Sequence, residues 1–172
     1  MNNQEYVRRI NIQQSGLFHK RKPFLTQLDI ELTERCNNNC VHCYINLPEN
    51  CEKSKKKELS TSQWKEIIKE SSELGSLSIR FTGGEPLLRD DFIDLYLFTR
   101  SLGIKVVLFT NARLITKELA ELLRKTPPLE KIEVSIYGMH PESNRQITSS
   151  NSGFKETQRG LQLLLQHQKY LL

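Results

Sequence analysis

Along most of the chain, apolar residues either alternate with polar ones or recur every three to four positions, and the two patterns take turns. Alternation or a short apolar run predicts strands at Thr26–Thr33, Leu77–Phe81, Ile104–Phe109 and Ile132–Ile136. Each is followed by a segment with helical spacing of its apolar residues. This alternation occurs four times, so it predicts an α/β protein with a parallel β-sheet and right-handed crossovers.

Short signals mark the ends of the predicted helices. Ser60 and Gln63 form a capping box that begins the first helix, and Gly75 ends it. The expected starts and ends of the other helices are Asp90 or Asp91 and Gly103, Thr116 and Pro127, and Phe154 and Leu172. Residues 46–59 and the polar stretch after Gly138 are expected to be loops.

Four β-α units are half of what closes a TIM barrel, so we expect a partial, TIM-like β/α barrel. Residues 26–172 form this core, and residues 1–25, which are polar with scattered apolar positions, form an N-terminal arm. The first sixteen residues lack the apolar core of a signal peptide, and no stretch is long enough to span a bilayer. We therefore expect a cytoplasmic protein with no membrane association.

The charge balance changes this picture little. The net charge is +5, and hydrophobic residues make up 37% of the chain, which is typical of a globular protein. The basic runs 20–22 and 53–57 have no interleaved aromatic residues, so we expect no nucleic-acid binding. The mild positive field instead favours an anionic substrate or an acidic electron-donor protein.

The unusual residues all follow predicted strands, where ligand sites of parallel α/β proteins lie. They are Cys36, Cys40 and Cys43 after the first strand, Gly83, Gly84, Glu85 and Pro86 after the second, Thr110 and Asn111 after the third, and Ser135 and Tyr137 at the fourth. We therefore expect four separate loops to meet at one site.

The three clustered cysteines predict a metal site, because thiolates are soft ligands for zinc, copper(I) or iron–sulfur clusters. A structural zinc site usually has four ligands, and His42 directly precedes Cys43, so both side chains would struggle to face one ion. Three thiolates on a four-iron cluster would leave one iron without a protein ligand. Such an open coordination site is needed for a reaction at the cluster, as opposed to simple electron transfer. The fourth cysteine, Cys51, is interpreted as an incidental loop thiol.

The Gly83-Gly84 pair lets the backbone approach a ligand closely, because glycine has no Cβ. Glu85 then places a carboxylate beside exposed backbone groups, which suits a ligand that carries an ammonium group. Alone this turn is a weak signal, but its place one strand from the cysteine loop strengthens it.

The spacing Cys36-x3-Cys40-x2-Cys43, followed by Gly-Gly-Glu-Pro after the next strand, resembles the radical S-adenosylmethionine (radical SAM) superfamily over residues 26–172. The segment from Val134 to Gly138 resembles the peptide-modifying subgroup, many members of which carry a C-terminal domain with auxiliary clusters. The resemblance implies an enzyme that cleaves S-adenosylmethionine reductively to a 5′-deoxyadenosyl radical. Its substrate would be a peptide or a small cofactor precursor, and its electron donor would be of the flavodoxin or ferredoxin type.

The same resemblance implies which residues bind the cofactors. A [4Fe-4S] cluster would be bound by Cys36, Cys40 and Cys43. S-adenosylmethionine would be contacted by Gly83, Gly84, Glu85, Pro86, Ser135, Tyr44 and Asn111.

The chain departs from the family pattern at several points. Ala112 and Ser149 stand where glycine is usual, and Tyr137 stands where many relatives have aspartate. The family core usually has six β-α units, so we expect a truncated chain, or part of a split enzyme whose barrel a second chain completes. The fourth strand would then be an open edge, which favours oligomers. Two alternatives stay open: a catalytically inactive iron–sulfur protein and a small zinc-binding interaction module.

Overall fold

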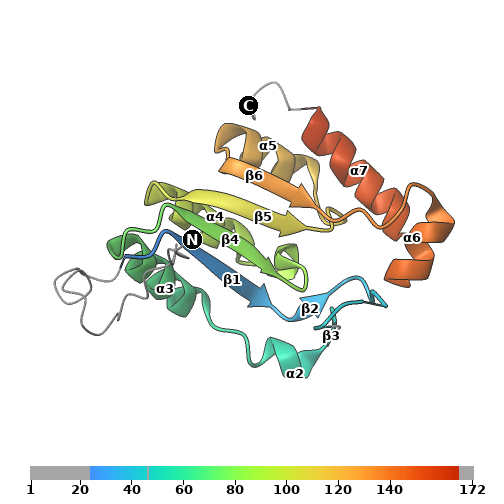
Figure 1. The fold of residues 1–172 in the computed structure, drawn as a ribbon, viewed down its shortest axis with the longest axis horizontal. Helices are drawn as coiled ribbons and strands as arrows, with labels where there is room; N and C mark the ends of the chain where they lie inside the picture. Colours follow the sequence, from blue (N-terminus) through green and yellow to red (C-terminus); the bar gives the residue numbers. More distant parts are fainter. Residues whose placement is uncertain (1–23, 46, 167–172) are drawn as a thin grey trace, which may run out of the picture.

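The computed structural model describes residues 24–45 and 47–166, and its centre is a sheet of four parallel strands. In spatial order these are β1 (Gln27–Thr33), β4 (Ser78–Gly83), β5 (Lys105–Thr110) and β6 (Leu129–Val134). All four arrowheads point to one end of the sheet, where the short strands and α6 also lie (Figure 1). The predicted parallel α/β fold is therefore confirmed, with β1 and β6 at the edges of this sheet. The predicted arm falls almost wholly outside the described residues.

Three helices connect the strands: α3 (Thr61–Glu73), α4 (Phe92–Ser101) and α5 (Lys117–Lys125). In Figure 1, α4 and α5 lie behind the sheet and α3 lies beside β1, and all three contribute residues to one core with the strands. The capping box is present, since the Ser60 side chain accepts from the Gln63 amide and the Gln63 side chain accepts from the Ser60 amide. Thr116 likewise accepts from the Leu119 amide. In the described part of the chain, no helix has the length and apolar character needed to cross a membrane.

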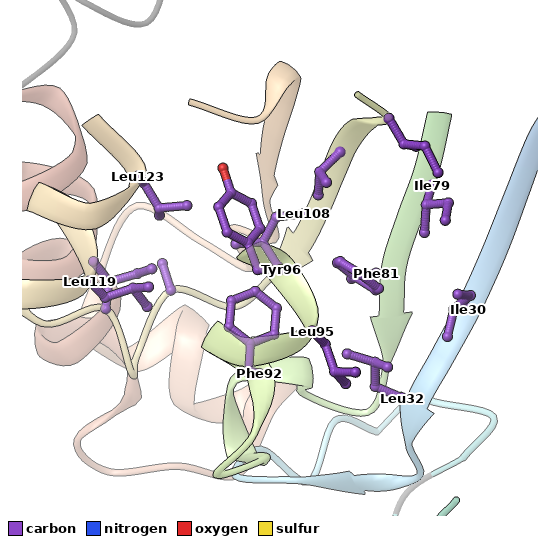
Figure 2. Packing of buried hydrophobic residues seen from close by; sticks show 14 of the residues in the cluster. Ile30, Leu32, Ile79, Phe81, Phe92, Leu95, Tyr96, Leu108, Leu119 and Leu123 are labelled. Atoms are coloured by element: carbon purple, nitrogen blue, oxygen red, sulfur yellow. The ribbon is translucent and has the colours of Figure 1, made fainter. Parts of the chain in front are cut away.

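The core lies between the sheet and these helices. Figure 2 shows Phe81 of β4 and Leu108 of β5 facing Phe92 and Tyr96 of α4. The buried Tyr96 hydroxyl donates to the Thr126 carbonyl oxygen at 2.6 Å, so its polar atom is satisfied. As predicted for a strand covered on both faces, residues 106–108 of β5 are buried.

The opposite face of the sheet is more polar, because side chains alternate across a strand. Asp29 of β1 accepts from Arg80 of β4 at 2.8 Å, and the Arg80 guanidinium lies 5.0 Å from the centre of the Phe109 ring of β5. The sheet thus separates an apolar core from a polar face that extends toward the carboxyl ends of the strands.

Both predicted loops contain regular structure that we did not expect. In the first, β3 (Leu47–Pro48) pairs in parallel with β2 (Arg35–Cys36) at the start of the cysteine loop, and α2 (Glu52–Lys55) follows. In the second, α6 (Pro141–Thr148) precedes α7 (Gly153–Leu165). The buried residues of α6 are Asn144 and Thr148, so this helix has almost none of the apolar periodicity that would have predicted it.

The fourth strand was predicted over the wrong range, since it already begins at Leu129 rather than at Ile132. The fourth strand ends at Val134 rather than continuing through Ile136, because its neighbour β5 ends at Thr110 and the Ser135 amide makes the last bond to it, at 3.0 Å. Asp91 is the N-cap residue of α4, as predicted, but its side chain makes no capping hydrogen bond, because its carboxylate accepts from Arg89 and Thr61 instead. The last helix is described to Leu165, and its expected end at Leu172 falls outside the described residues.

Both residues that replace the usual glycine have left-handed backbone conformations. Ala112 has φ of 60° and Ser149 has φ of 54°, which side chains other than glycine rarely adopt. Ser149 is exposed and ends α6, whereas Ala112 is completely buried. These two sequence departures therefore mark positions of backbone strain.

We predict that Ser149→Gly stabilises the chain by about 1 kcal/mol, because glycine removes the left-handed strain at an exposed position. Ala112→Gly should give no such gain, since it also removes a buried methyl group worth about 0.8 kcal/mol. Urea unfolding of both variants and the parent chain checks this. Equal stabilisation by the two substitutions would contradict it.

Candidate functional site

A cavity of about 200 Å³ opens at the carboxyl ends of the strands. It is lined by Cys36, Asn38, Cys40, His42, Cys43, Tyr44, Thr82, Gly83, Gly84, Phe109, Thr110, Asn111, Ser135 and Tyr137. The residues predicted from four separate loops therefore do meet at one place. Glu85 and Pro86 are the predicted site residues that do not line it.

The cysteine loop, residues 36–43, is hydrogen-bonded through its backbone to the end of α6. The Asn39 amide donates to the Thr148 carbonyl oxygen and the Val41 amide to that of Ile147, each at 2.9 Å. Within the loop, the Cys43 amide donates to the Cys40 carbonyl oxygen at 3.1 Å. These bonds satisfy backbone groups that a loop without regular structure would otherwise leave unpaired.

The two glycines bring β4 against the start of this loop. The Gly84 amide donates to the Thr33 carbonyl oxygen at 2.7 Å, and the Glu85 amide donates to that of Arg35 at 2.8 Å. A Cβ on Gly83 would lie 2.3 Å from the Thr33 oxygen, and one on Gly84 would lie 2.2 Å from the Arg35 oxygen. Glycine is therefore required here because two backbone segments approach closely. The sequence alone indicated only the close approach of a ligand.

Glu85 does not face the cavity, which corrects the expected direct contact with an ammonium group. Its side chain is completely buried and accepts from Thr110 Oγ1 at 2.8 Å, the Asn111 amide at 2.8 Å and the Leu87 amide at 3.2 Å. Pro86 is buried as well. The Glu85 carboxylate thus joins the ends of β4 and β5 beneath the site.

Burial raises the pKa of Glu85 to about 7, and the hydrogen bonds from Asn111 and Thr110 partly oppose that rise. The carboxyl group therefore changes charge near neutral pH. It lies close enough to Cys36 for its negative charge to raise the pKa of that thiol.

Asn111 and Arg113 hold the first half of the cysteine loop. Asn111 Nδ2 donates to Asn37 Oδ1 at 2.7 Å and lies 3.9 Å from Cys36 Sγ. Arg113 Nη1 donates to the Asn37 carbonyl oxygen and, at 2.7 Å, to Asn38 Oδ1. Arg113 was missed from the sequence, although a basic residue directly after a strand-end turn is a signal that could have indicated it.

A buried ionic cluster supports the other side of the loop. Glu58 accepts from Arg35 Nε at 2.7 Å and from Arg89 Nη1 at 3.3 Å, and both guanidinium groups are nearly inaccessible. Burial opposes ionisation of Glu58, but the bonds from Arg35 and Thr33 and the two positive charges lower its pKa. Because Arg35 directly precedes Cys36, this cluster fixes the point where the loop begins.

Aromatic residues border the cavity. The His42 and Tyr137 rings lie 5.3 Å apart and are tilted by 58°, and Tyr137 also contacts Ser135. The Tyr44 ring is exposed, and its hydroxyl donates to Glu31 Oε1 at 2.5 Å. That hydrogen bond raises the pKa of Tyr44 to about 12, so its hydroxyl stays neutral.

Burial favours the neutral thiol form of Cys36 and Cys40 in the metal-free protein. Burial, the charge of Glu85 and the neighbouring cysteines raise the pKa of Cys36 to about 11, against a lowering by the Asn38 amide. Burial, followed by Cys43, also raises the pKa of Cys40, whereas Tyr137 and Arg113 oppose this rise. Metal ligation requires thiolates, so metal binding here must release protons.

The three cysteines fit an iron–sulfur cluster in donor type and placement, since soft thiol groups from one loop line a single cavity. Cys51 does not line it. Across the described ranges, no three His, Cys, Asp or Glu side chains converge closely enough to hold a single metal ion.

Comparison with protein families gives one match over most of the chain. The family model described as the Radical SAM superfamily matches residues 30–170. The chain is 35% identical over 130 residues to Fe-coproporphyrin III synthase of Methanosarcina barkeri, a match that covers 76% of this chain and 31% of that protein. It is 38% identical over 94 residues to PqqA peptide cyclase of Bradyrhizobium diazoefficiens, covering 54% and 24% of the two chains. The chain thus spans less than a third of these two curated relatives.

Among solved structures, SuiB of Streptococcus suis shares the fold with a TM-score of 0.67 at 22% identity, over 86% of this chain and 31% of SuiB. SuiB has also been solved bound to S-adenosylmethionine and bound to its precursor peptide SuiA. At this level of identity the likeness concerns the fold.

We predict that Gly84→Ala destabilises the chain and lowers its iron and sulfide content after anaerobic reconstitution. The new methyl group would overlap the Arg35 carbonyl oxygen and push Cys36 away from its place, and overpacking of this kind costs about 1–3 kcal/mol. Gly103→Ala is the matched control, because a Cβ there meets nothing within 4 Å although its φ is +78°. Similar iron content and unfolding in both variants would argue against the close approach.

We predict that the metal-free chain loses stability as pH rises from about 4.5 to 7. The folded state binds the Glu85 proton more tightly than the unfolded chain does, so this stabilisation is complete below pH 4.5 and is lost through pH 7. Urea unfolding of Glu85→Gln should show lower stability but a flatter pH profile. Glu66→Gln, at an exposed position on α3, should keep the parent's slope. A decline of equal size in both variants would refute the assignment.

Proposed function

The chain belongs to the Radical SAM superfamily, and on that premise we propose that Cys36, Cys40 and Cys43 bind the [4Fe-4S] cluster that this family implies, beside S-adenosylmethionine. One observation carries the proposal. The three thiols open into the same cavity as Gly83, Gly84 and Ser135. When bound, the cluster and S-adenosylmethionine supply reductive cleavage to methionine and a 5′-deoxyadenosyl radical, which abstracts a hydrogen atom.

The chain's own residues bind and orient the cofactors. The Gly83-Gly84 backbone borders the cavity and offers polar groups to the methionyl part of S-adenosylmethionine. Ser135 and Asn111 provide further polar contacts, and Tyr44 provides an aromatic face at the cavity edge. Glu85 acts from beneath as a positioning residue, since its carboxylate holds the Asn111 amide and Thr110 at 2.8 Å.

We propose that the substrate is a peptide or a cofactor precursor. Relatives named as a peptide cyclase and as a coproporphyrin synthase support both classes, and the structure of SuiB bound to a precursor peptide supports the first. A one-electron donor of the flavodoxin or ferredoxin type would reduce the cluster.

The free side of β6 supports a further polypeptide packing beside it. In the described sheet, β6 pairs only with β5. Beside it lies a groove lined partly by Ile136, Met139, Phe154 and Leu161, and more than half of the Ile136 and Met139 surfaces is exposed. An open strand edge next to apolar surface favours association. We therefore propose that a second chain, or more of the same protein, completes the barrel here.

We predict that the anaerobically reconstituted chain is brown and that alanine at Cys36, Cys40 or Cys43 abolishes cluster assembly. Cys51→Ala, which leaves the cavity lining intact, should retain the parent's iron and sulfide content. With reductant and S-adenosylmethionine, the parent should release 5′-deoxyadenosine. Cluster without deoxyadenosine would favour an inactive iron–sulfur protein, and a colourless chain with stoichiometric zinc would favour a zinc module.

A further inference from the structure

Arg113 has no role in the function proposed above, yet its side chain is buried against the cysteine loop. We propose that Arg113 is a positioning residue for this loop and that, with Glu156, it sets the charge next to the cluster. This inference rests on the proposed cluster site. It goes further in assigning a function to an ion pair outside the cysteine and glycine motifs.

The Arg113 guanidinium bridges two parts of the chain. Its Nη1 atom donates to the Asn37 carbonyl oxygen and to Asn38 Oδ1, and its Nε atom donates to Glu156 Oε2 at 2.6 Å. The Arg113 side chain is only 10% exposed. A planar guanidinium has several donors in fixed directions, so it can hold the loop and the carboxylate together, which an ammonium group cannot do equally well.

Helix α7 braces this arrangement by docking on the turn that carries Arg113. Thr157 Oγ1 donates to the Asn111 carbonyl oxygen at 2.9 Å, and Arg159 Nη2 donates to the Arg113 carbonyl oxygen at 2.7 Å. A Cβ on Gly160 would lie 2.0 Å from the Ala112 carbonyl oxygen, so helix and turn pack with no room between them. Arg113 therefore links α7 to the cysteine loop.

Arg113 and Glu156 carry opposite charges, and Arg159 adds a second positive charge near Glu156. Glu156 is 34% exposed, and although burial opposes its ionisation, the Arg113 hydrogen bond and charge hold its pKa below the ordinary value. Arg113 thus places a positive charge beside the loop, and its ion pair with Glu156 offsets that charge. The reduction potential of an iron–sulfur cluster depends on net charge and hydrogen bonding around it, so loss of either partner leaves an unbalanced charge of known sign.

The decisive measurement is the midpoint potential of the reconstituted cluster. Arg113→Gln leaves Glu156 unpaired and should shift the potential to more negative values, whereas Glu156→Gln leaves Arg113 unpaired and should shift it to more positive values. The double variant should return close to the parent. Arg145→Gln is the matched control, because Arg145 forms an exposed pair with Glu142 on α6 and should cause no shift. Shifts of the same sign, or none, would overturn the charge assignment.

Amide hydrogen exchange of the metal-free chain tests the positioning role independently of the cluster. In both Arg113→Gln and Arg113→Lys, the amide hydrogens of Asn39 and Val41 should exchange about tenfold faster than in the parent. The loop opens more readily once the bonds from the guanidinium to the loop are lost. Arg113→Lys keeps the charge, so its potential should stay close to the parent's. Unchanged exchange would overturn the positioning role. A parent chain that binds no cluster would refute the proposed function and its charge corollary, while the exchange result would still decide the positioning role.

Discussion

The site depends on one close approach between two backbones. Strands β1 and β4 keep their hydrogen bonding beyond the sheet, so that residues 84 and 85 donate to the carbonyl oxygens of Thr33 and Arg35. Only glycine fits at positions 83 and 84, because any Cβ would overlap those oxygens. This contact fixes where the cysteine loop begins, and it also places the Gly-Gly backbone along the cavity. A single sequence feature thereby determines both the position of the cysteine loop and the lining of the cavity next to it.

The rest of the loop is held by polar contacts rather than by apolar packing. The ionic cluster around Glu58 holds Arg35, the end of α6 accepts two loop amides, and Arg113 binds the first loop residues. Every one of these partners also has bonds to its own surroundings. Such a network holds the loop in place while all three cysteines still line the cavity.

The sequence predicted the sheet, its helices and the residues around the cavity, because apolar periodicity and caps report on backbone conformation directly. It did not predict α6, whose buried residues are polar, nor the end of β6, which depends on where β5 stops. The environment of Glu85 was equally hidden, since its donors Thr110 and Asn111 come from a different strand. Contacts between distant loops leave no periodic trace in a single sequence, so the bonds from Arg113 to Asn37 and Asn38 were not predicted.

The bonds from Asn39 and Val41 to Thr148 and Ile147 join residues more than a hundred positions apart. Contacts of such long range form late, because the entropy of closing the intervening loop is lost before they contribute. During synthesis the cysteines leave the ribosome well before the helices that brace them. The cysteine loop therefore acquires its final shape only after α6 has folded, and until then these two backbone bonds cannot hold its three thiols in place.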